Sequence, residues 1–404
     1  MATEHDTATG AQLDVDLYTR EIFHDPYPTL ERIRAAGPVV WNGLAGGWMV
    51  TGDAEIRKTL SNFKDFTLDG APPQRLFGRE AFIVIDNKPE HDALRNVWAP
   101  AFSRGAVQQL RPAILRIIDT MLAEFEERLR SGETVDAYTH FCRDIPAYVI
   151  AGMLGIPDSH RPDIVRWSDL MGAAVISPPA ADGSLTPEWI AGEQAKAELA
   201  AFLIEQMQHR RRHPGDDLIS HMVHAEPART MSDDAIMKNC RQLLFAGNET
   251  TAKWLGHIMV VMDRHPDARR AVAADRSLIT DANEEVMRFE PVVHRTHRRA
   301  RGGDARIAGV HIPDGDLVIM LLGAGNRDPR RYERPQEFDI RRPAMGNLGF
   351  GFGMHSCLGV SLARVEAEIA LSRLLDRIPG YRVAGEVGYQ GLGLRGPTPL
   401  PVAL

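Results

Sequence analysis

Apolar residues along most of the chain recur every three or four positions, the spacing that gathers side chains on one face of an α-helix. The clearest stripe predicts a helix through residues 114–129, with a buried face formed by Ile114, Ile117, Ile118, Met121, Leu122, Phe125 and Leu129. A second long helix is predicted to start after Ser232, because serine is a preferred N-cap and two acidic residues follow it.

Strand-like patterns are short. Residues 39–51 predict a β-hairpin with Gly43–Gly47 as its turn. After Arg298, the runs Ala305–Val310 and Leu317–Leu322 predict further short strands. The pattern therefore indicates a mainly α fold with small β-sheets, in the α+β class.

The composition is that of a globular chain with a large core, since 44% of the 404 residues are hydrophobic and 25% are charged. At ~150 residues per domain, this length alone would predict two or three domains. The net charge of −7 argues against nucleic acid as a partner.

The chain contains no uninterrupted apolar run of the ~18 residues that a membrane-spanning helix needs. It begins with polar and acidic residues rather than with a basic stretch followed by an apolar one. We therefore expect a cytoplasmic protein without a signal peptide or membrane anchor. The cysteines Cys142, Cys240 and Cys357 are too few and too scattered for a disulfide framework.

Chemistry is concentrated in residues 350–359, which read Phe-Gly-Phe-Gly-Met-His-Ser-Cys-Leu-Gly. Gly351 and Gly353 allow a tight turn and a close approach to a flat ligand. Cys357 comes just before a predicted helix, whose amide donors favour a thiolate suited to a soft metal or to nucleophilic chemistry. A glycine-rich turn with an incidental cysteine is the alternative reading of Cys-Leu-Gly alone.

This loop resembles the haem-ligand loop of the cytochrome P450 family, Phe-Gly-x-Gly-x-His-x-Cys-x-Gly followed by Leu-Ala-Arg, at every fixed position. The resemblance implies a single domain over residues 1–404, with a long central helix above haem b (iron protoporphyrin IX) and the cysteine loop beneath it. Cys357 would be the axial thiolate of the iron, and thiolate ligation favours O–O cleavage. Phe350, Gly351 and Gly359 would contact the haem beside it.

The segment Leu243–Ala252 resembles the family's central helix, which carries an acid next to an alcohol. By that resemblance Glu249 would relay protons and the Thr250 hydroxyl would deliver them to the oxygen-binding side, and positioned proton transfer is typically worth ~10²–10⁴-fold in rate. Leu243, Ala246 and Gly247 share a helical face with Thr250 and leave room for a ligand. Without the cysteine loop, Glu-Thr-Thr would more often be a solvated helix face.

Glu285 and Arg288 resemble the family's structural Glu-x-x-Arg pair. The family adds a third, basic residue from a later loop, where this chain has Glu337. Arg341 or Arg342 could replace it.

Four residues resemble the family's partners for the haem propionates, because buried carboxylates need charged or hydrogen-bonding groups. They are His91, Arg95, Arg298 and His355.

By family position, the substrate pocket would be lined mostly by apolar residues, namely Phe77, Phe82, Ile83, Leu243, Ala246, Gly247, Val293, His294, Leu392 and Leu394. A small-to-medium apolar substrate, with aromatic compounds among the candidates, fits this composition. His294 could bind a polar substituent, but a hydrogen-bonded histidine that faces away is the preferred reading. The loop Ser177–Ser184 is equally compatible with a lid over the entrance and with a passive connector.

The resemblance implies an oxidoreductase, a haem-thiolate monooxygenase that inserts one atom of O2 by hydroxylation or oxidative dealkylation. Electrons would come from a separate ferredoxin and ferredoxin reductase, because no flavin or iron–sulfur signature is present. The ferredoxin would dock near Cys357, on positive charge from Lys88, Arg95, Arg104 and Arg364. A peroxide-driven peroxygenase and a non-catalytic haem-thiolate sensor are the alternatives.

Overall fold

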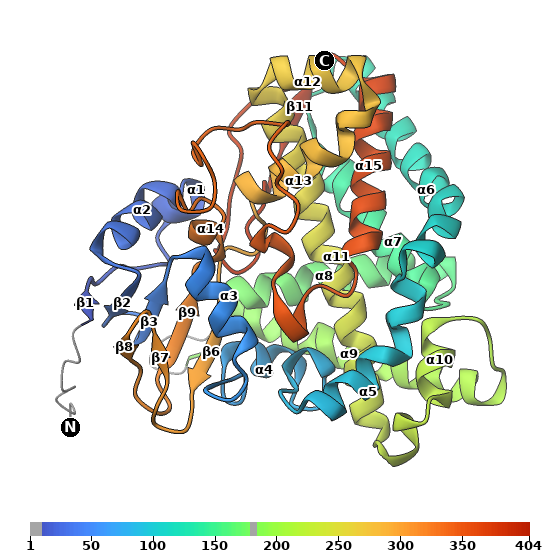
Figure 1. Cartoon of the computed structure of the whole chain (residues 1–404). Helices are drawn as coiled ribbons and strands as arrows, with labels where there is room; N and C mark the ends of the chain where they lie inside the picture. Colours follow the sequence, from blue (N-terminus) through green and yellow to red (C-terminus); the bar gives the residue numbers. More distant parts are fainter. Residues whose placement is uncertain (1–9, 178–183) are drawn as a thin grey trace.

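Helices form most of the molecule, and the main sheet lies along one side (Figure 1). The computed structural model describes residues 10–177 and 184–404. The helices are α1 (Arg20–His24), α2 (Tyr27–Ala36), α3 (Asp53–Ser61), α4 (Pro72–Phe77), α5 (Lys88–Trp98), α6 (Arg104–Arg130), α7 (Asp144–Met153), α8 (Arg161–Ile176), α9 (Pro187–Arg212), α10 (Leu218–His224), α11 (Asp233–Arg264), α12 (Pro266–Ala274), α13 (Ile279–Phe289), α14 (Leu322–Gly325) and α15 (Val360–Arg377). None of them combines the length and hydropathy that crossing a membrane requires.

Three small sheets accompany the helices. The strands are β1 (Ala11–Gln12), β2 (Val39–Asn42), β3 (Gly47–Val50), β4 (Phe66–Thr67), β5 (Val135–Asp136), β6 (Thr296–Ala300), β7 (Arg306–Ile307), β8 (Val310–His311), β9 (Leu317–Met320), β10 (Arg382–Val383) and β11 (Pro401–Ala403). The main sheet has the order β1-β2-β3-β9-β6-β4, and β10-β11-β5 and β7-β8 form the other two. The prediction of a mainly helical fold with small sheets is confirmed.

The main sheet brings distant parts of the chain into register. The predicted hairpin is present, with Val39 paired to Val50 across β2 and β3. Strand β3 runs parallel to β9, which in turn pairs antiparallel with β6. Arg298 lies opposite Val318 in that last pair, so the sheet fixes where residues 296–300 enter the molecule.

Two strand predictions were wrong in their bounds. The run Ala305–Val310 is not one strand, because Ala308 (φ 50°) and Gly309 (φ 85°) turn the chain between β7 and β8. The run Leu317–Leu322 ends as a strand at Met320, since α14 begins at Leu322.

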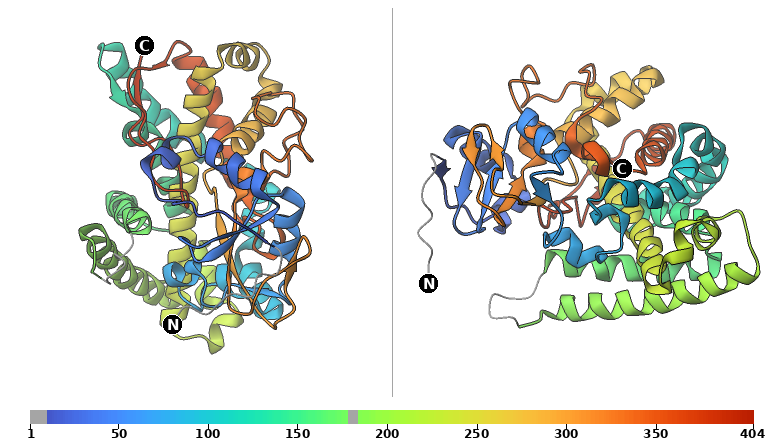
Figure 2. Two further views of the ribbon diagram at one scale, coloured as in Figure 1. Left: turned by 90° about the vertical axis from the view of Figure 1, so that its left-hand side faces the viewer. Right: turned by 60° about the horizontal axis from the view of Figure 1, so that its bottom comes forward.

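Helix α11 passes through the centre of the helical body (Figure 1) and is buried along most of its length. Its predicted start is confirmed, because the Ser232 hydroxyl accepts a hydrogen bond from the Ala235 N–H at 3.1 Å. Helices α8 and α9 lie side by side across it (Figure 2). The predicted loop Ser177–Ser184 falls largely on residues 178–183, outside the described residues, so the lid and connector hypotheses both stay predictions.

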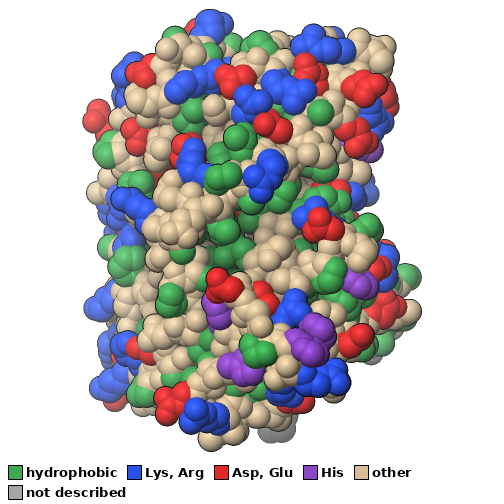
Figure 3. All heavy atoms as spheres, turned by 90° about the vertical axis from the view of Figure 1, so that its right-hand side faces the viewer, with side chains coloured by type: hydrophobic (Ala, Val, Ile, Leu, Met, Phe, Trp, Pro, Cys, Tyr) green, Lys and Arg blue, Asp and Glu red, His purple; other side chains and the backbone are tan. Residues whose placement is uncertain are grey.

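Helix α15, which follows Cys357, packs against α6. The stripe predicted on α6 is confirmed, since Ile114, Ile118 and Leu122 are buried in the main core. Ion pairs lie along the same contact, joining Arg111 to Glu368 (2.9 Å), Arg373 to Asp119 (2.6 Å) and Arg377 to Glu126 (2.6 Å). Acidic and basic side chains intermingle on the face that contains α6 (Figure 3). Exposed pairs of this kind contribute about 0–1 kcal/mol each, so apolar packing holds α15 in place.

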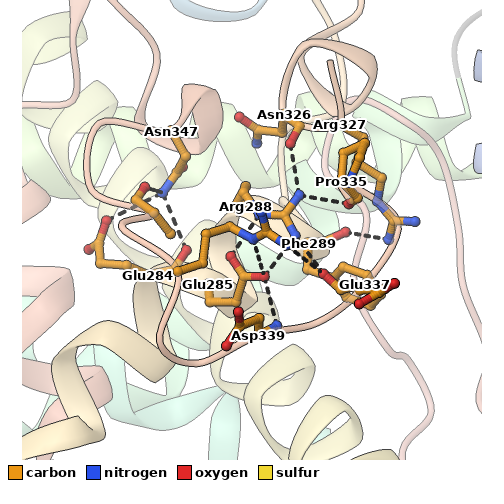
Figure 4. A network of polar contacts seen from close by, with 12 residues as sticks. Glu284, Glu285, Arg288, Phe289, Asn326, Arg327, Pro335, Glu337, Asp339 and Asn347 are labelled. Carbon is orange, nitrogen blue, oxygen red and sulfur yellow. Dashed lines mark hydrogen bonds and ion pairs between the residues drawn. The ribbon is translucent and has the colours of Figure 1, made fainter. Parts of the chain in front are cut away.

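A buried polar network holds the segment that leads to the cysteine loop (Figure 4). Arg288 donates two hydrogen bonds of 2.7 Å to the Glu285 carboxylate, and both side chains are fully buried. The Arg288 guanidinium also donates to the backbone carbonyls of Asn326, Pro335 and Glu337. Position 337 therefore contributes its backbone oxygen, while its side chain pairs with exposed Arg334.

The third basic partner of the pair is Arg342, one of the two predicted candidates. Its Nε lies 3.2 Å from Glu285 Oε1, and its side chain is 8% exposed. Arg341, by contrast, is exposed at the surface. The buried Glu285 carboxylate thus receives hydrogen bonds from two guanidinium groups, and both guanidinium groups also donate to backbone carbonyls.

Replacing Arg342 with methionine should lower the free energy of unfolding by about 3 kcal/mol, because the Glu285 carboxylate and the carbonyls of Glu333 and Arg334 lose a charged donor. The midpoint of urea unfolding, followed by circular dichroism, measures this. Arg341→Met removes the same charge at the adjacent, exposed position and should change the free energy of unfolding by less than about 0.5 kcal/mol. Equal effects of the two substitutions would contradict the assignment of Arg342 as the third partner.

Candidate active site

The cysteine loop is built by backbone turns between β9 and α15. The N–H of Cys357 donates to the Phe350 carbonyl at 2.9 Å, closing the loop. Gly351 (φ 70°) and Gly353 (φ 76°) both adopt the left-handed conformation, so the predicted tight turn is present. A side-chain carbon at Gly353 would also lie 3.0 Å from the Leu60 carbonyl of α3. Only glycine satisfies both constraints at this position.

The thiol of Cys357 borders a cavity inside the molecule, which accounts for its accessible surface. Burial raises the pKa of this thiol, and the Gly359 N–H and the guanidinium groups of Arg95 and Arg364 oppose that rise. The amide donor acts as predicted, but burial outweighs it in the isolated chain. A positive charge beside the sulfur is therefore needed to make the thiolate the favoured form.

The other two cysteines have a different environment. Cys142 and Cys240 are fully buried in the main core, and burial raises the thiol pKa of both, that of Cys240 to about 12. Cys357 is therefore the cysteine suited to bind a metal.

The cavity has a volume of about 680 Å³ and lies between α11 and the cysteine loop. Most of the predicted site residues border it, namely Phe77, Phe82, Ile83, Arg95, Leu243, Ala246, Gly247, Thr250, Val293, Arg298, Phe350, Gly351, His355, Cys357, Gly359, Leu392 and Leu394. His91, Glu249 and His294 do not border it. One wall is therefore α11 with Thr250, and another is the loop with Cys357.

His294 faces away from the cavity, as the preferred interpretation held. Among the described residues neither ring nitrogen makes a hydrogen bond of good geometry, although the backbone of Pro291 lies close enough to favour the protonated ring. The centre of the ring lies 5.9 Å from that of Tyr27, and the ring packs against Gly323. Burial lowers the pKa of His294 well below its usual value, so the ring is neutral. A substrate contact for His294 is not supported by this geometry.

Three of the four predicted propionate partners, Arg95, Arg298 and His355, border the cavity, and His91 lies behind His355. The rings of His91 and His355 lie 4.8 Å apart, edge to face. His355 Nε2 is 3.8 Å from Asp86, too long for a hydrogen bond. Arg95 is close enough to Cys357 that the two charges interact.

These groups have unmet hydrogen-bonding capacity. His91 Nε2, Arg298 Nε and both nitrogens of His355 are buried without a partner among the described residues. Burial lowers the pKa of Arg298 to about 10, and nearby Asp86 opposes this. Because an unsatisfied buried donor costs about 1–3 kcal/mol, such a group of donors indicates an anionic ligand.

The acid and the alcohol of α11 point in different directions. The Thr250 hydroxyl faces the cavity and donates to the Ala246 carbonyl at 2.9 Å. The Glu249 carboxylate lies 2.7 Å from the Lys253 ammonium, which also donates to the Leu394 carbonyl. Glu249 approaches Gly172 of α8, so it is separated from the cavity that Thr250 faces. The expected side-by-side pair is therefore not formed in this arrangement.

The structure adds cavity residues that sequence reasoning missed. Trp189, Glu193 and Lys196 come from α9, and Gln242 and Thr251 from α11, while Tyr18 precedes α1 and Arg295 precedes β6. Glu366 of α15 also borders the cavity. Its helical spacing from Leu362 and Ala363, next to the cysteine loop, could have predicted it.

Glu366 is buried, and its Oε2 has no hydrogen-bond partner among the described residues. Burial raises the pKa of this carboxyl to about 8. The unfolded chain ionises it above pH 4.5, whereas the folded protein keeps it protonated up to about pH 8. Unfolding therefore releases a proton in this range, and this carboxyl makes the protein less stable as pH rises.

Replacing Glu366 with glutamine removes this titration. Relative to the unsubstituted protein, the variant should gain roughly 2–4 kcal/mol of stability between pH 5 and pH 8. Urea unfolding at the two pH values measures the difference. Glu368→Gln, a substitution nearer the surface of the same helix, should show no such trend. If the stability difference between Glu366→Gln and the unsubstituted protein did not change with pH, the Glu366 carboxyl would not be buried in its protonated form.

Comparison with known proteins agrees with this arrangement. The family model described as Cytochrome P450 matches residues 54–378. Cytochrome P450 107B1 of Saccharopolyspora erythraea is 37% identical over an alignment of 374 positions that covers 88% of this chain and 86% of that protein. The cytochrome P450 monooxygenase PikC of Streptomyces venezuelae is 32% identical, over 98% of this chain and 95% of that protein.

A solved structure shares the whole architecture. The crystal structure of CalO2 superposes with a TM-score of 0.86 at 30% sequence identity, covering 97% of this chain and 98% of that chain. A cysteine loop beneath a central helix, a cavity between them and a family match over most of the chain lead to one conclusion: the chain belongs to the cytochrome P450 family, whose members bind haem b.

Proposed function

We propose that this cytochrome P450 monooxygenase inserts one oxygen atom of O2 into a small-to-medium apolar substrate, by hydroxylation or oxidative dealkylation. The family establishes the class of enzyme and the cofactor. The observation that carries the proposal is that one largely apolar cavity is bordered by both Cys357 and Thr250.

The residues at the cavity fit haem b, and we assign them to it. Cys357 would bind the iron, whose positive charge would favour the thiolate that burial alone disfavours. Arg298, His355, His91 and Arg95 would hold the propionates, which would satisfy the buried donors left without partners. When bound, the haem supplies the oxygen chemistry that no side chain of this protein provides.

Thr250 is the residue proposed to deliver protons in the cavity. Its hydroxyl borders the cavity, and its bond to the Ala246 carbonyl fixes its orientation while leaving its oxygen free to accept a proton. Glu249 is held by Lys253, so it would have to leave that ion pair to reprotonate Thr250. Asp169 of α8, whose pKa is raised to about 6 by burial with Glu249 nearby, could take up protons on the outer side.

The apolar residues that line the cavity support an apolar substrate. Phe77 and Phe82 border the cavity, and Phe77 packs edge to face with Phe245 of α11. Aromatic and aliphatic walls favour an apolar molecule and contribute about 25 cal/mol for each Å² of apolar surface buried.

Thr250→Ala should uncouple electron use from product formation, because positioned proton transfer is typically worth ~10²–10⁴-fold in rate. Product formed per electron pair should fall by about tenfold or more. The assay uses holoprotein, a surrogate ferredoxin system and a substrate first identified by its shift of the haem spin state.

Thr250→Ser keeps the hydroxyl and should keep most of the coupling. Turnover of the unsubstituted protein with hydrogen peroxide, but not with O2 and the ferredoxin system, would favour the peroxygenase alternative. Ligand binding without product in every variant would favour the sensor alternative.

We also propose a separate ferredoxin as electron donor, docking on the surface around Cys357, and a cytoplasmic location for the pair. The four cations expected there are not equivalent. Lys88 pairs with Asp92, Arg364 pairs with Glu284 and packs on Phe350, and Arg95 faces the cavity. Arg104, exposed at the start of α6, is therefore the strongest candidate for an electrostatic contact.

Arg104→Glu should slow ferredoxin-driven turnover several-fold at low salt, and added salt should remove the difference. The substitution should not weaken the fold, since a helix N-terminus favours an acidic side chain. Arg116→Glu, an exposed position about 18 Å along the same helix, is the matched control. A salt-independent loss, or an equal loss in the control, would count against docking at this position.

A further inference from the structure

One guanidinium on the cavity wall has no acidic partner among the described residues. Arg295 borders the cavity just before β6, and its guanidinium carbon lies 4.6 Å from the centre of the Tyr18 ring. Its Nε is buried without a hydrogen-bond partner. Within residues 10–177 and 184–404, no carboxylate lies within ion-pair distance of it.

The other cations of the cavity wall have counter-charges or assigned partners. Lys196 lies 3.3 Å from Glu193, a neighbour on α9 that also borders the cavity. Arg95 and Arg298 belong to the edge where the haem propionates would lie. In the part of the chain that the structure describes, Arg295 is thus the lining guanidinium left without a negative charge.

Arg295 is also set apart from that edge. Three residues of extended chain, at about 3.3 Å each, place its Cα roughly 10 Å from that of Arg298. Its neighbours on the wall are apolar, including Val292, Val293 and Leu394. An unpaired charge among such groups is costly, and a bound anion would remove that cost.

The chemistry of the group selects the kind of anion. A guanidinium is planar and can donate two parallel hydrogen bonds to the oxygens of one carboxylate. The Tyr18 ring covers one face of that fork and stabilises its charge by a cation–π contact, which leaves the N–H edges for a ligand. A single guanidinium balances one negative charge, as in a carboxylate, rather than the two of a phosphate monoester.

We propose that Arg295, supported by Tyr18, binds the carboxylate of an otherwise apolar substrate, so that the enzyme oxidises apolar carboxylic acids away from the acid group. This inference rests on the proposed monooxygenase function and narrows its substrate class.

The test compares aromatic and fatty carboxylic acids with their own methyl esters, by titrating the ferric holoprotein and following the haem spin state. Acids that fit the cavity should bind about tenfold or more tightly than their esters, since hydrogen bonds to charged groups are worth about 1.5–3 kcal/mol. Arg295→Gln should abolish this preference while leaving ester affinity unchanged. Arg295→Lys should retain part of it.

Arg299→Gln is the control, because Arg299 carries the same charge four residues further along, in β6, but donates to the Gly70 and Gly315 carbonyls. It should leave the acid preference intact. Haem content is measured in each variant. A loss of haem in Arg295→Gln as large as in Arg298→Gln would overturn the proposal, because Arg295 would then hold the cofactor.

Equal binding of acids and esters by the unsubstituted protein would also overturn it. That result leaves the monooxygenase proposal standing if the esters are oxidised. Conversely, acids that bind through Arg295 but give no product would support the binding site and count against the proposed function.

Discussion

The buried carboxylate of Glu285 is the point on which the lower half of the active site depends. Two guanidinium groups, Arg288 and Arg342, surround it, and Arg288 also grips three backbone carbonyls of the segment that follows β9. That segment continues into the cysteine loop, where Asn326 accepts a hydrogen bond from the Leu348 N–H at 2.6 Å. The position of Cys357 is therefore set by a charge cluster on α13 rather than by contacts of the sulfur itself.

The ionic state of the cavity follows from burial. A protonated Glu366, a neutral His294 behind the wall and a thiol at Cys357 all reflect the cost of charge in a low-dielectric site. The arginines keep their charge, because a guanidinium is hardly ever deprotonated. The result is a cavity that is positive in the isolated chain and suited to anionic ligands at two places.

Much of the fold and of the candidate site could be predicted from short stretches of sequence. The cysteine loop reads as a unit because glycine, histidine and cysteine occur within ten residues, and the α6 stripe and the Ser232 cap depend only on local spacing. What could not be predicted depends on distant partners. The Leu394 carbonyl that holds Lys253, and through it Glu249, lies 141 residues away, and the ring that covers Arg295 belongs to Tyr18. The family resemblance paired Glu249 with Thr250 but said nothing of which way the Glu249 carboxylate turns.

Arg288 holds the segment after β9 through backbone oxygens rather than through side chains. Because every residue has a carbonyl, the contacts to Asn326, Pro335 and Glu337 do not specify those side chains. Apart from Asn326 and Arg342, whose side chains make contacts of their own, residues along the segment can be substituted without detaching it, provided the chain path stays the same. The surface of this segment is thereby free to diverge while Cys357 beneath it keeps its place.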